Sequence, residues 1–182
     1  FQIRGFKLGL PSPTPAVPIL VGALREGMLR LAGREGDGAI VNWLSADDVS
    51  TVAPIVKEFG VDKEVVARIF VALTDDRDLV MSYGKFAIAA YLTVPVYRAF
   101  HEWLGRGELM APMQEAWAAG DRKAALATIP DELVDALVVH GEPSVCRERI
   151  QEYVDNGITT PVLAVLPVGV DAETAVRELA PQ

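Results

Sequence analysis

A glycine followed by two apolar residues, Gly22-Ala23-Leu24, is the first place where this sequence could do chemistry. It comes directly after the apolar run 17–21 and directly before a helical pattern that starts at Arg25. Backbone N–H groups at such a turn, together with the positive end of a helix dipole, bind an anion without a basic side chain. Gly22 would let a phosphate oxygen approach the backbone closely. The alternative is an ordinary turn glycine, which the residues alone favour.

Asn42, Trp43 and His140 are the side chains that could line a substrate pocket. Asn42 and Trp43 end a second apolar run, and active-site side chains collect at that end of a barrel strand. Because side chains alternate along a strand, one of the two should point inward, and we expect it to be Asn42. His140 precedes a turn glycine, so it could line the pocket or donate a proton. Core packing of Trp43 and a histidine stabilised by a helix dipole are the alternatives.

The remaining reactive side chains are better explained by structure than by chemistry. Asp75 and Asp76 could do acid–base work, but aspartates at a helix start are more often caps. His101 lies in an aromatic helical tract and is expected to pack or to face solvent. The lone cysteine, Cys146, is expected to be buried. The sequence has no metal-ligand spacing, no Walker loop and no GxGxxG motif, so it predicts no metal site.

Four apolar runs are predicted to be the strands that position these residues: 17–23, 38–44, 65–73 and 159–166. Helical patterns separate them. Strands that alternate with helices form a parallel sheet through right-handed crossovers, so the predicted fold class is α/β. Such a sheet is either open and doubly wound or half of a (β/α)8 barrel, because a full barrel needs about 250 residues.

The third and fourth predicted strands lie far apart in the sequence, and the tract 76–129 between them is predicted to be a helical insertion. Thr93 with Pro95, residues 105–107 and Gly120 divide this tract into several helices. Its aromatic and apolar side chains would form the core of a helical subdomain.

The sequence also marks where helices begin. Ser45, with Asp48 three residues later, resembles a capping box for a helix that runs to about residue 59. Pro143 suits a first helical turn that follows another helix over 130–140. Asp171 is expected to cap the last helix.

Composition places the chain among globular proteins of about one domain. It has 182 residues, of which 51% are hydrophobic and 23% charged. The net charge of 17 − 25 = −8 disfavours nucleic acid as a partner, and no apolar run approaches the roughly 20 residues that span a bilayer. A single cysteine fits a reducing, cytoplasmic compartment. Because the chain opens on Phe1 without an initiator methionine, we expect a piece of a longer protein.

Two segments carry a family resemblance. The first, 17–44, contains VPILVGAL, MLRLAG and GDGAIVNWL, and the second, 139–157, contains a Gly-x-Pro turn that opens a helix. Both resemble the luciferase-like monooxygenase family and, more narrowly, its oxidoreductases that use the deazaflavin coenzyme F-420. The resemblance implies a luciferase-like (β/α)8 TIM barrel. Residues 1–182 would be the C-terminal half of that single domain, with strands five to eight.

The resemblance also implies a cofactor and a reaction. Gly22, Ala23 and Leu24 would contact the phosphate of coenzyme F-420 or, alternatively, of FMN. The intact enzyme would move a hydride between C5 of the deazaflavin and a small organic substrate. An FMN-dependent monooxygenase of the same superfamily and a noncatalytic, self-assembling half barrel are the alternatives. The half alone would be inactive, and its open strand edges and apolar inner face predict a homo-oligomer.

Overall fold

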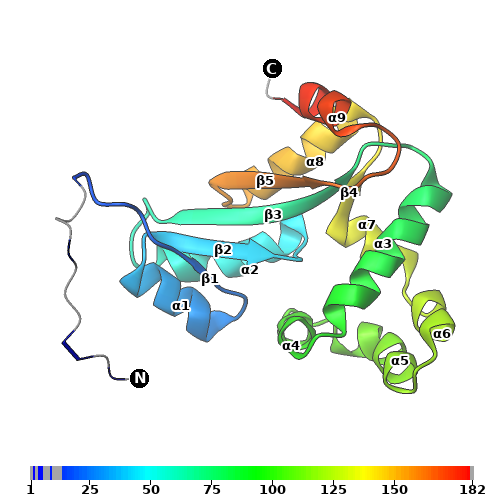
Figure 1. The fold of residues 1–182 in the computed structure, drawn as a ribbon, viewed down its shortest axis with the longest axis horizontal. Coiled ribbons are helices and arrows are strands. Elements are labelled where there is room, and N and C mark those ends of the chain that lie inside the picture. The colour runs from blue at the N-terminus through cyan, green and yellow to red at the C-terminus, as the bar shows by residue number, and fades with distance from the viewer. Residues whose placement is uncertain (1, 3, 6–8, 10–13, 181–182) are drawn as a thin grey trace.

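The computed structural model describes residues 2, 4, 5, 9 and 14–180, which contain a five-stranded parallel sheet flanked by helices (Figure 1). The strands are β1 Leu20–Gly22, β2 Gly38–Asn42, β3 Glu64–Ala72, β4 Val138–His140 and β5 Thr160–Val165. β1 pairs with β2, β2 pairs with β3, and β3 pairs with both β4 and β5, always in parallel. The α/β fold class and the four predicted strands are confirmed, although β1 begins only at Leu20.

The short strand β4 was not predicted from the sequence. We expected one helix over 130–140, but helix α7, Asp131–Leu137, ends earlier and the chain continues in extended conformation. Val138 and Val139 are β-branched and suit a strand. The carboxyl end of β3 extends past β2 and supplies Phe70, Val71 and Ala72 as pairing partners. Pairing with β3 therefore determines that residues 138–140 form a strand rather than the end of a helix.

Four helices follow β1, β2, β4 and β5 in turn: α1 Glu26–Glu35, α2 Ala46–Lys57, α8 Pro143–Asp155 and α9 Ala172–Leu179. Between β3 and α7 run α3 Arg77–Leu92, α4 Pro95–Trp103, α5 Gly107–Ala118 and α6 Arg122–Ala127, with breaks where the sequence predicted them. In Figure 1, α3, α5 and α6 lie to the lower right of the sheet, and α4 lies below it. Among the described helices, none is by itself long and apolar enough to cross a membrane, although α3 and α4 together pass that test with a bend of 102° between them.

The predicted caps are present. Ser45 Oγ accepts a hydrogen bond from the amide of Asp48 at 3.2 Å, and Asp48 Oδ2 accepts one from the amide of Ser45 at 2.7 Å. Asp76 and Asp171 cap α3 and α9 by accepting from the amides of Leu79 and Thr174. Each carboxylate satisfies an amide that the first helical turn leaves without a partner. The cap interpretation of Asp76 is therefore confirmed.

Two apolar clusters pack on opposite faces of the sheet. Along β3, Val65, Ala67, Ile69 and Val71 belong to the first cluster, whereas Phe70 and Ala72 belong to the second. The first cluster contains the buried faces of α1, α2, α8 and α9, which lie on the rear face of the sheet in Figure 1. The second contains side chains of α3, α5 and α7 and covers the carboxyl end of the other face. We call this other face the inner face, since a barrel would close over it.

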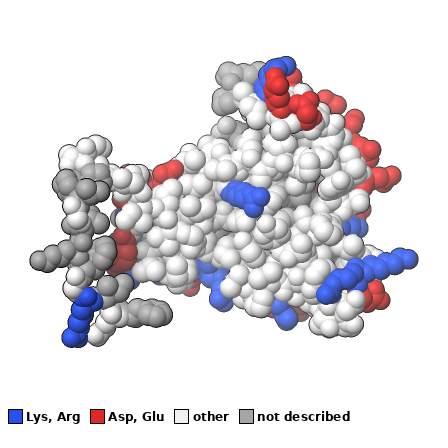
Figure 2. Space-filling model, viewed as in Figure 1, with Lys and Arg blue, Asp and Glu red and all other residues white. Residues whose placement is uncertain are grey.

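Among the described residues, much of the rest of the inner face is exposed, although Val66 of β3 is buried. Ile40 of β2 and Val162 of β5 are 43% and 46% exposed. Arg68, which is aligned with Asn42 and with Val162, is also exposed between them. Figure 2 shows that this side of the molecule is largely uncharged across its middle, with most acidic and basic side chains at the rim. An apolar face of this kind favours association.

Gly33 allows α1 and α2 to approach each other closely. A Cβ atom at Gly33 would lie 2.5 Å from the carbonyl oxygen of Val56 in α2. We expect Gly33→Ala to lower the free energy of unfolding by about 1–3 kcal/mol through overpacking. Gly27→Ala in the same helix is the matched control, since its Cβ meets no atom within 4 Å. That substitution should raise stability by about 0.5–1 kcal/mol, and equal effects in urea titrations would contradict the packing argument.

Candidate functional site

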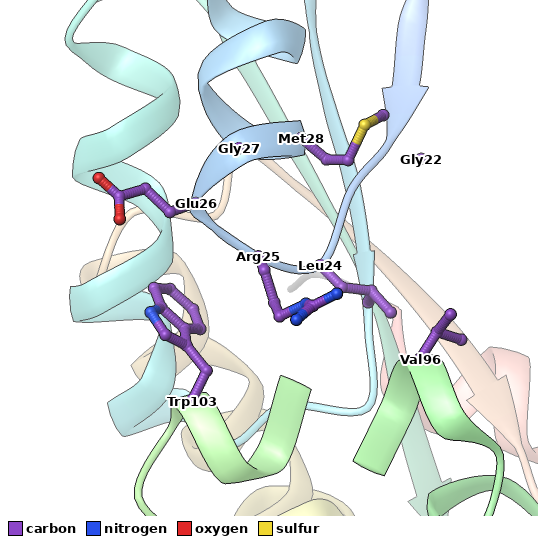
Figure 3. Close-up of a pocket in the computed structure, with 8 residues that line it drawn as sticks. All are labelled: Gly22, Leu24, Arg25, Glu26, Gly27, Met28, Val96 and Trp103. Carbon is purple, nitrogen blue, oxygen red and sulfur yellow. The ribbon is translucent and has the colours of Figure 1, made fainter. Parts of the chain in front are cut away.

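A pocket of about 680 Å³ opens where β1 ends and α1 begins (Figure 3). This volume is in the range of small-molecule sites. One side is built from the loop and first turn of α1, and the other from α4. Its lining residues are Gly22, Leu24, Arg25, Glu26, Gly27, Met28, Val96 and Trp103. Two of the three residues predicted to contact a cofactor phosphate, Gly22 and Leu24, therefore line it.

The first turn of α1 forms the polar side of the pocket. Arg25 is the N-cap residue, and its side chain makes no capping hydrogen bond. The amides of the first helical turn have no acceptor within the helix and carry the positive end of its dipole. Glu26 is the acidic residue of this turn, and in Figure 3 its carboxylate points away from Arg25 and Leu24. The pocket therefore presents N–H donors and the Arg25 side chain to a ligand.

Ala23 differs from its two neighbours. Its amide donates a hydrogen bond to the carbonyl oxygen of Ile40 at 3.0 Å and so extends the pairing of β1 with β2. This amide is therefore not available to a ligand, and Ala23 is buried. Cβ atoms at Gly22 and Gly27 would meet no protein atom within 4 Å. Sequence reasoning missed Gly27, although a glycine in the first turn of a helix is the signal that could have identified it.

The opposite side of the pocket is apolar. Val96 and Trp103 lie seven residues apart on α4, which is two helical turns, and both line the pocket. Met28 of α1 is 44% exposed and adds a third apolar contact surface. In Figure 3 the side chains of Val96 and Trp103 extend from α4 toward the loop that carries Leu24 and Arg25. The arrangement suits a ligand with an anionic group at one side and an apolar body at the other.

Asn42 and Trp43 both turn toward the inner face, so the expectation that one of them alone would do so is wrong. The alternation of side chains between the two faces of β2 ends at Asn42, because the backbone of Trp43 is left-handed, with φ of 55°. Asn42 Oδ1 accepts from the Trp43 amide at 3.0 Å and supports this conformation. Its Nδ2 donates to Tyr97 Oη of α4 at 3.1 Å. Asn42 therefore links the end of β2 to α4.

The Trp43 ring lies within the second cluster. It is 1% exposed and stacks on Phe70, with ring centroids 4.0 Å apart, and also meets Tyr91 at 5.1 Å. These contacts are those of a core tryptophan. Neither Asn42 nor Trp43 is among the residues that line the pocket at Gly22. A substrate role for either stays a prediction.

His140 ends β4 and belongs to a charged cluster. Its Nε2 lies 2.9 Å from Asp135 Oδ1, and Arg77 donates to both oxygens of that carboxylate at 3.3 and 3.2 Å. Burial tends to raise the pKa of Asp135, but hydrogen bonds from Arg77 and His140 outweigh it and lower that pKa. His140 is aligned with Ala72 at the carboxyl end of β3, away from the pocket at Gly22. The structure therefore does not bring the predicted site residues into one cavity.

A buried polar cluster joins α2, α4 and α5, and sequence reasoning did not identify it. Arg106 Nη2 lies 2.9 Å from Asp48 Oδ2 and donates to Ser45 Oγ at 3.2 Å. His101 is fully buried, and burial, reinforced by the positive charge of Arg106, lowers its pKa to about 4. Within the described residues, neither ring nitrogen of His101 makes a hydrogen bond of normal geometry, although the nearby backbone of Trp43 partly opposes this lowering of the pKa. Nη1 of Arg106 also has no hydrogen-bond partner there. The packing interpretation of His101 is confirmed.

Cys146 is buried, as the sequence predicted. Burial raises the pKa of its thiol to about 11, and its Sγ donates to the carbonyl oxygen of Gly141 at 3.4 Å. A thiol with this pKa is protonated at neutral pH and is a poor nucleophile. Cys146 therefore acts as a small residue of the first cluster.

Comparison with known proteins places these features in a family. The model of the luciferase-like monooxygenase family matches residues 3–160. A 5,10-methylenetetrahydromethanopterin reductase from Methanolobus tindarius is 30% identical over 169 residues, covering 88% of this chain and 52% of the relative. The enzyme of the same name from Archaeoglobus fulgidus is 25% identical over 190 residues, with coverage of 97% and 56%. The chain thus spans about half the length of the curated relatives it matches.

A solved structure of a similar protein has the same fold over the length of this chain. The coenzyme F-420-dependent tetrahydromethanopterin reductase from Methanopyrus kandleri superposes with a TM-score of 0.69 at 24% sequence identity. The match covers 90% of this chain and 49% of that one, as expected for half of a luciferase-like barrel. Because the family model matches well over half of the residues, the chain belongs to the luciferase-like monooxygenase family.

Proposed function

We propose that this chain is the C-terminal half of an oxidoreductase that moves a hydride between coenzyme F-420 and a small organic substrate. Two similar curated proteins are named as reductases of a pterin-bound methylene group, which supports that substrate class. The observation that carries the proposal is the pocket at the start of α1, where uncapped amides face an apolar wall. Phosphate groups bind at helix N-termini of this kind.

The residues present fit a phosphate-bearing deazaflavin. Gly22 and Gly27 leave open space where a side chain would otherwise stand, so a phosphate oxygen can approach the backbone. Arg25 adds a positive charge beside the first turn of α1. Leu24, Met28, Val96 and Trp103 offer apolar contacts to the rest of the molecule. Ala23 contributes no amide, because its N–H already pairs with Ile40.

When bound, coenzyme F-420 supplies the hydride chemistry, and the protein supplies position and electrostatics. Here the amides of the α1 first turn and Arg25 would bind the phosphate, and the α4 wall would orient the apolar part and exclude water from it. The chain covers about half of its relatives, and within the described residues much of its inner face away from the second cluster is exposed. We therefore infer that activity needs the complementary half, and that this chain alone is inactive.

Gly22→Val tests the phosphate site. A Cβ at this position touches no protein atom, so the fold should tolerate the substitution while the new methyl groups occupy the space of the phosphate. We expect the dissociation constant for coenzyme F-420 to rise at least tenfold, measured by titrating the change in cofactor fluorescence. FMN, titrated in parallel, distinguishes the deazaflavin enzyme from the flavin monooxygenase alternative.

Gly107→Val is the matched control for this experiment. Gly107 begins α5 outside the pocket, and its Cβ would make ordinary contact with Glu102 at 3.5 Å. This variant should bind coenzyme F-420 as the unchanged chain does. Equal affinity of the Gly22→Val variant, with its fold intact, would remove Gly22 from the site. Failure of the unchanged chain to bind either cofactor would favour the noncatalytic half barrel.

A further inference from the structure

Helix α4 carries the apolar wall of the pocket, but polar contacts outside the pocket determine where it lies. At its first turn, Tyr97 Oη accepts from Asn42 Nδ2 at the end of β2. Just beyond its last turn, Arg106 reaches the N-terminus of α2, where it lies 2.9 Å from Asp48 Oδ2 and 3.2 Å from Ser45 Oγ. Polar contacts therefore connect both ends of α4 to the segment that runs from the end of β2 to the start of α2.

The second of these ties is a buried ion pair. The side chains of Arg106 and Asp48 are 17% and 9% exposed, whereas those of the Arg98–Glu102 pair on α4 itself are 54% and 44% exposed. Asp48 Oδ2 also accepts the Ser45 amide, so the carboxylate that receives Arg106 is fixed by the capping box. Removing one partner of such a pair leaves an uncompensated buried charge, which disrupts the local packing.

We propose that Arg106 and Asp48 are positioning residues that hold Val96 and Trp103 of α4 against the first turn of α1 and so set the width of the cofactor pocket. The proposal rests on the proposed function for the identity of the ligand. The claim that Arg106 and Asp48 fix the position of α4 does not depend on the proposed function, because that position can be measured without a cofactor. The Asn42–Tyr97 hydrogen bond assists by fixing the other end of the same helix.

Loss of the tie is expected to release α4 before the sheet unfolds. Phe100 and His101 are fully buried and anchor the second half of α4, whereas Val96 in its first turn is 54% exposed. Trp103 stacks on Phe100 with ring centroids 6.1 Å apart and is partly buried. A shift of α4 would therefore expose Trp103 and separate the two sides of the pocket together.

The experiment compares Arg106→Met with Arg98→Met. Arg98 lies on α4 in an exposed pair with Glu102, 2.7 Å apart, and serves as the control. Acrylamide quenching of tryptophan fluorescence is measured on the unchanged chain and on each variant. The same measurement is made after adding Trp103→Phe to each of them, and the difference between the two gives the quenching of Trp103. We expect Arg106→Met to at least double the quenching of Trp103 and to raise the dissociation constant for coenzyme F-420 at least tenfold. Arg98→Met should change neither, and Arg106→Lys should recover part of both.

The outcomes separate the two proposals. If the unchanged chain binds no coenzyme F-420 but Arg106→Met still exposes Trp103, the proposed function fails and the positioning role stands. If Arg106→Met binds coenzyme F-420 as the unchanged chain does, or leaves Trp103 equally protected, the positioning role is wrong. Should Arg106→Met fail to fold, Asp48→Asn, which keeps the shape of the partner side chain but removes the charge that Arg106 meets, replaces it. That variant should raise both the quenching of Trp103 and the dissociation constant in the same direction by smaller factors, and no change in either would overturn the proposal.

Discussion

Acidification from pH 7 to pH 4 is expected to lower the free energy of unfolding of this chain by about 3 kcal/mol through His101 alone. The buried ring stays neutral in the folded chain until the pH approaches its pKa of about 4. In the unfolded chain the same ring takes up a proton near pH 6.5. Between these values the unfolded state binds more protons, so stability falls as the pH falls.

The physical cause lies in the surroundings of His101. Burial disfavours the charged imidazolium, and the positive charge of Arg106 adds to that effect, while the carboxylate of Asp48 opposes it. Urea titrations between pH 7 and pH 4 on the unchanged chain and on His101→Gln measure the contribution as a difference. His140→Gln is the control for loss of the other histidine. A His101→Gln variant with the same pH dependence as the unchanged chain would contradict the prediction.

In solution the chain is expected to associate rather than to persist as a 19.6 kDa monomer. In the part of the chain that the structure describes, β1 and β5 each pair with one strand, so each offers backbone donors and acceptors along its other edge. Ile40 and Val162 are half exposed on the inner face, and burying such apolar area contributes on the order of 25 cal/mol per Å². The charge of −8 opposes association only modestly where salt screens over about 8 Å.

Light scattering over a concentration series checks this, with two lysine variants as probes. Val162→Lys places a charge on the inner face and should shift the chain toward monomer. Val176→Lys, on a residue of α9 that is 69% exposed, adds the same charge away from that face and should leave assembly unchanged. A constant 19.6 kDa particle for the unchanged chain at all concentrations would show that the inner face does not drive association.

Local signals in the sequence predicted most of the fold. Ser45, Asp76 and Asp171 identify helix starts because a capping side chain acts on amides within three residues of itself. The apolar runs identify the strands as well: β2 and β3 are buried over much of their length, whereas β1 and β5 are only partly buried. Strand β4 could not be found in this way. Its three residues pair with Phe70, Val71 and Ala72, which lie almost 70 residues earlier in the chain.

The candidate site was harder to predict than the fold. Gly22 and Leu24 stand at a turn that the sequence shows, but Val96 and Trp103 come from a helix whose position the sequence does not give. The direction of the Trp43 ring could not be inferred, because alternation assumes extended backbone and Trp43 has φ of 55°. Arg106 and Asp48 are far apart in the chain, so the sequence around either residue does not indicate that the two form an ion pair.

The long, mainly helical segment between β3 and β5 affects how the chain folds during its synthesis. Val65 and Thr159, where these strands begin to pair, are 94 residues apart, and closing so long a loop is slow compared with forming local helices. During synthesis, which adds about 5–20 residues per second, β1, β2 and β3 leave the ribosome well before β5. The backbone groups of β3 that later pair with β5 stay open throughout this interval. The nascent chain is therefore most prone to pair with other strands just before its last strand appears.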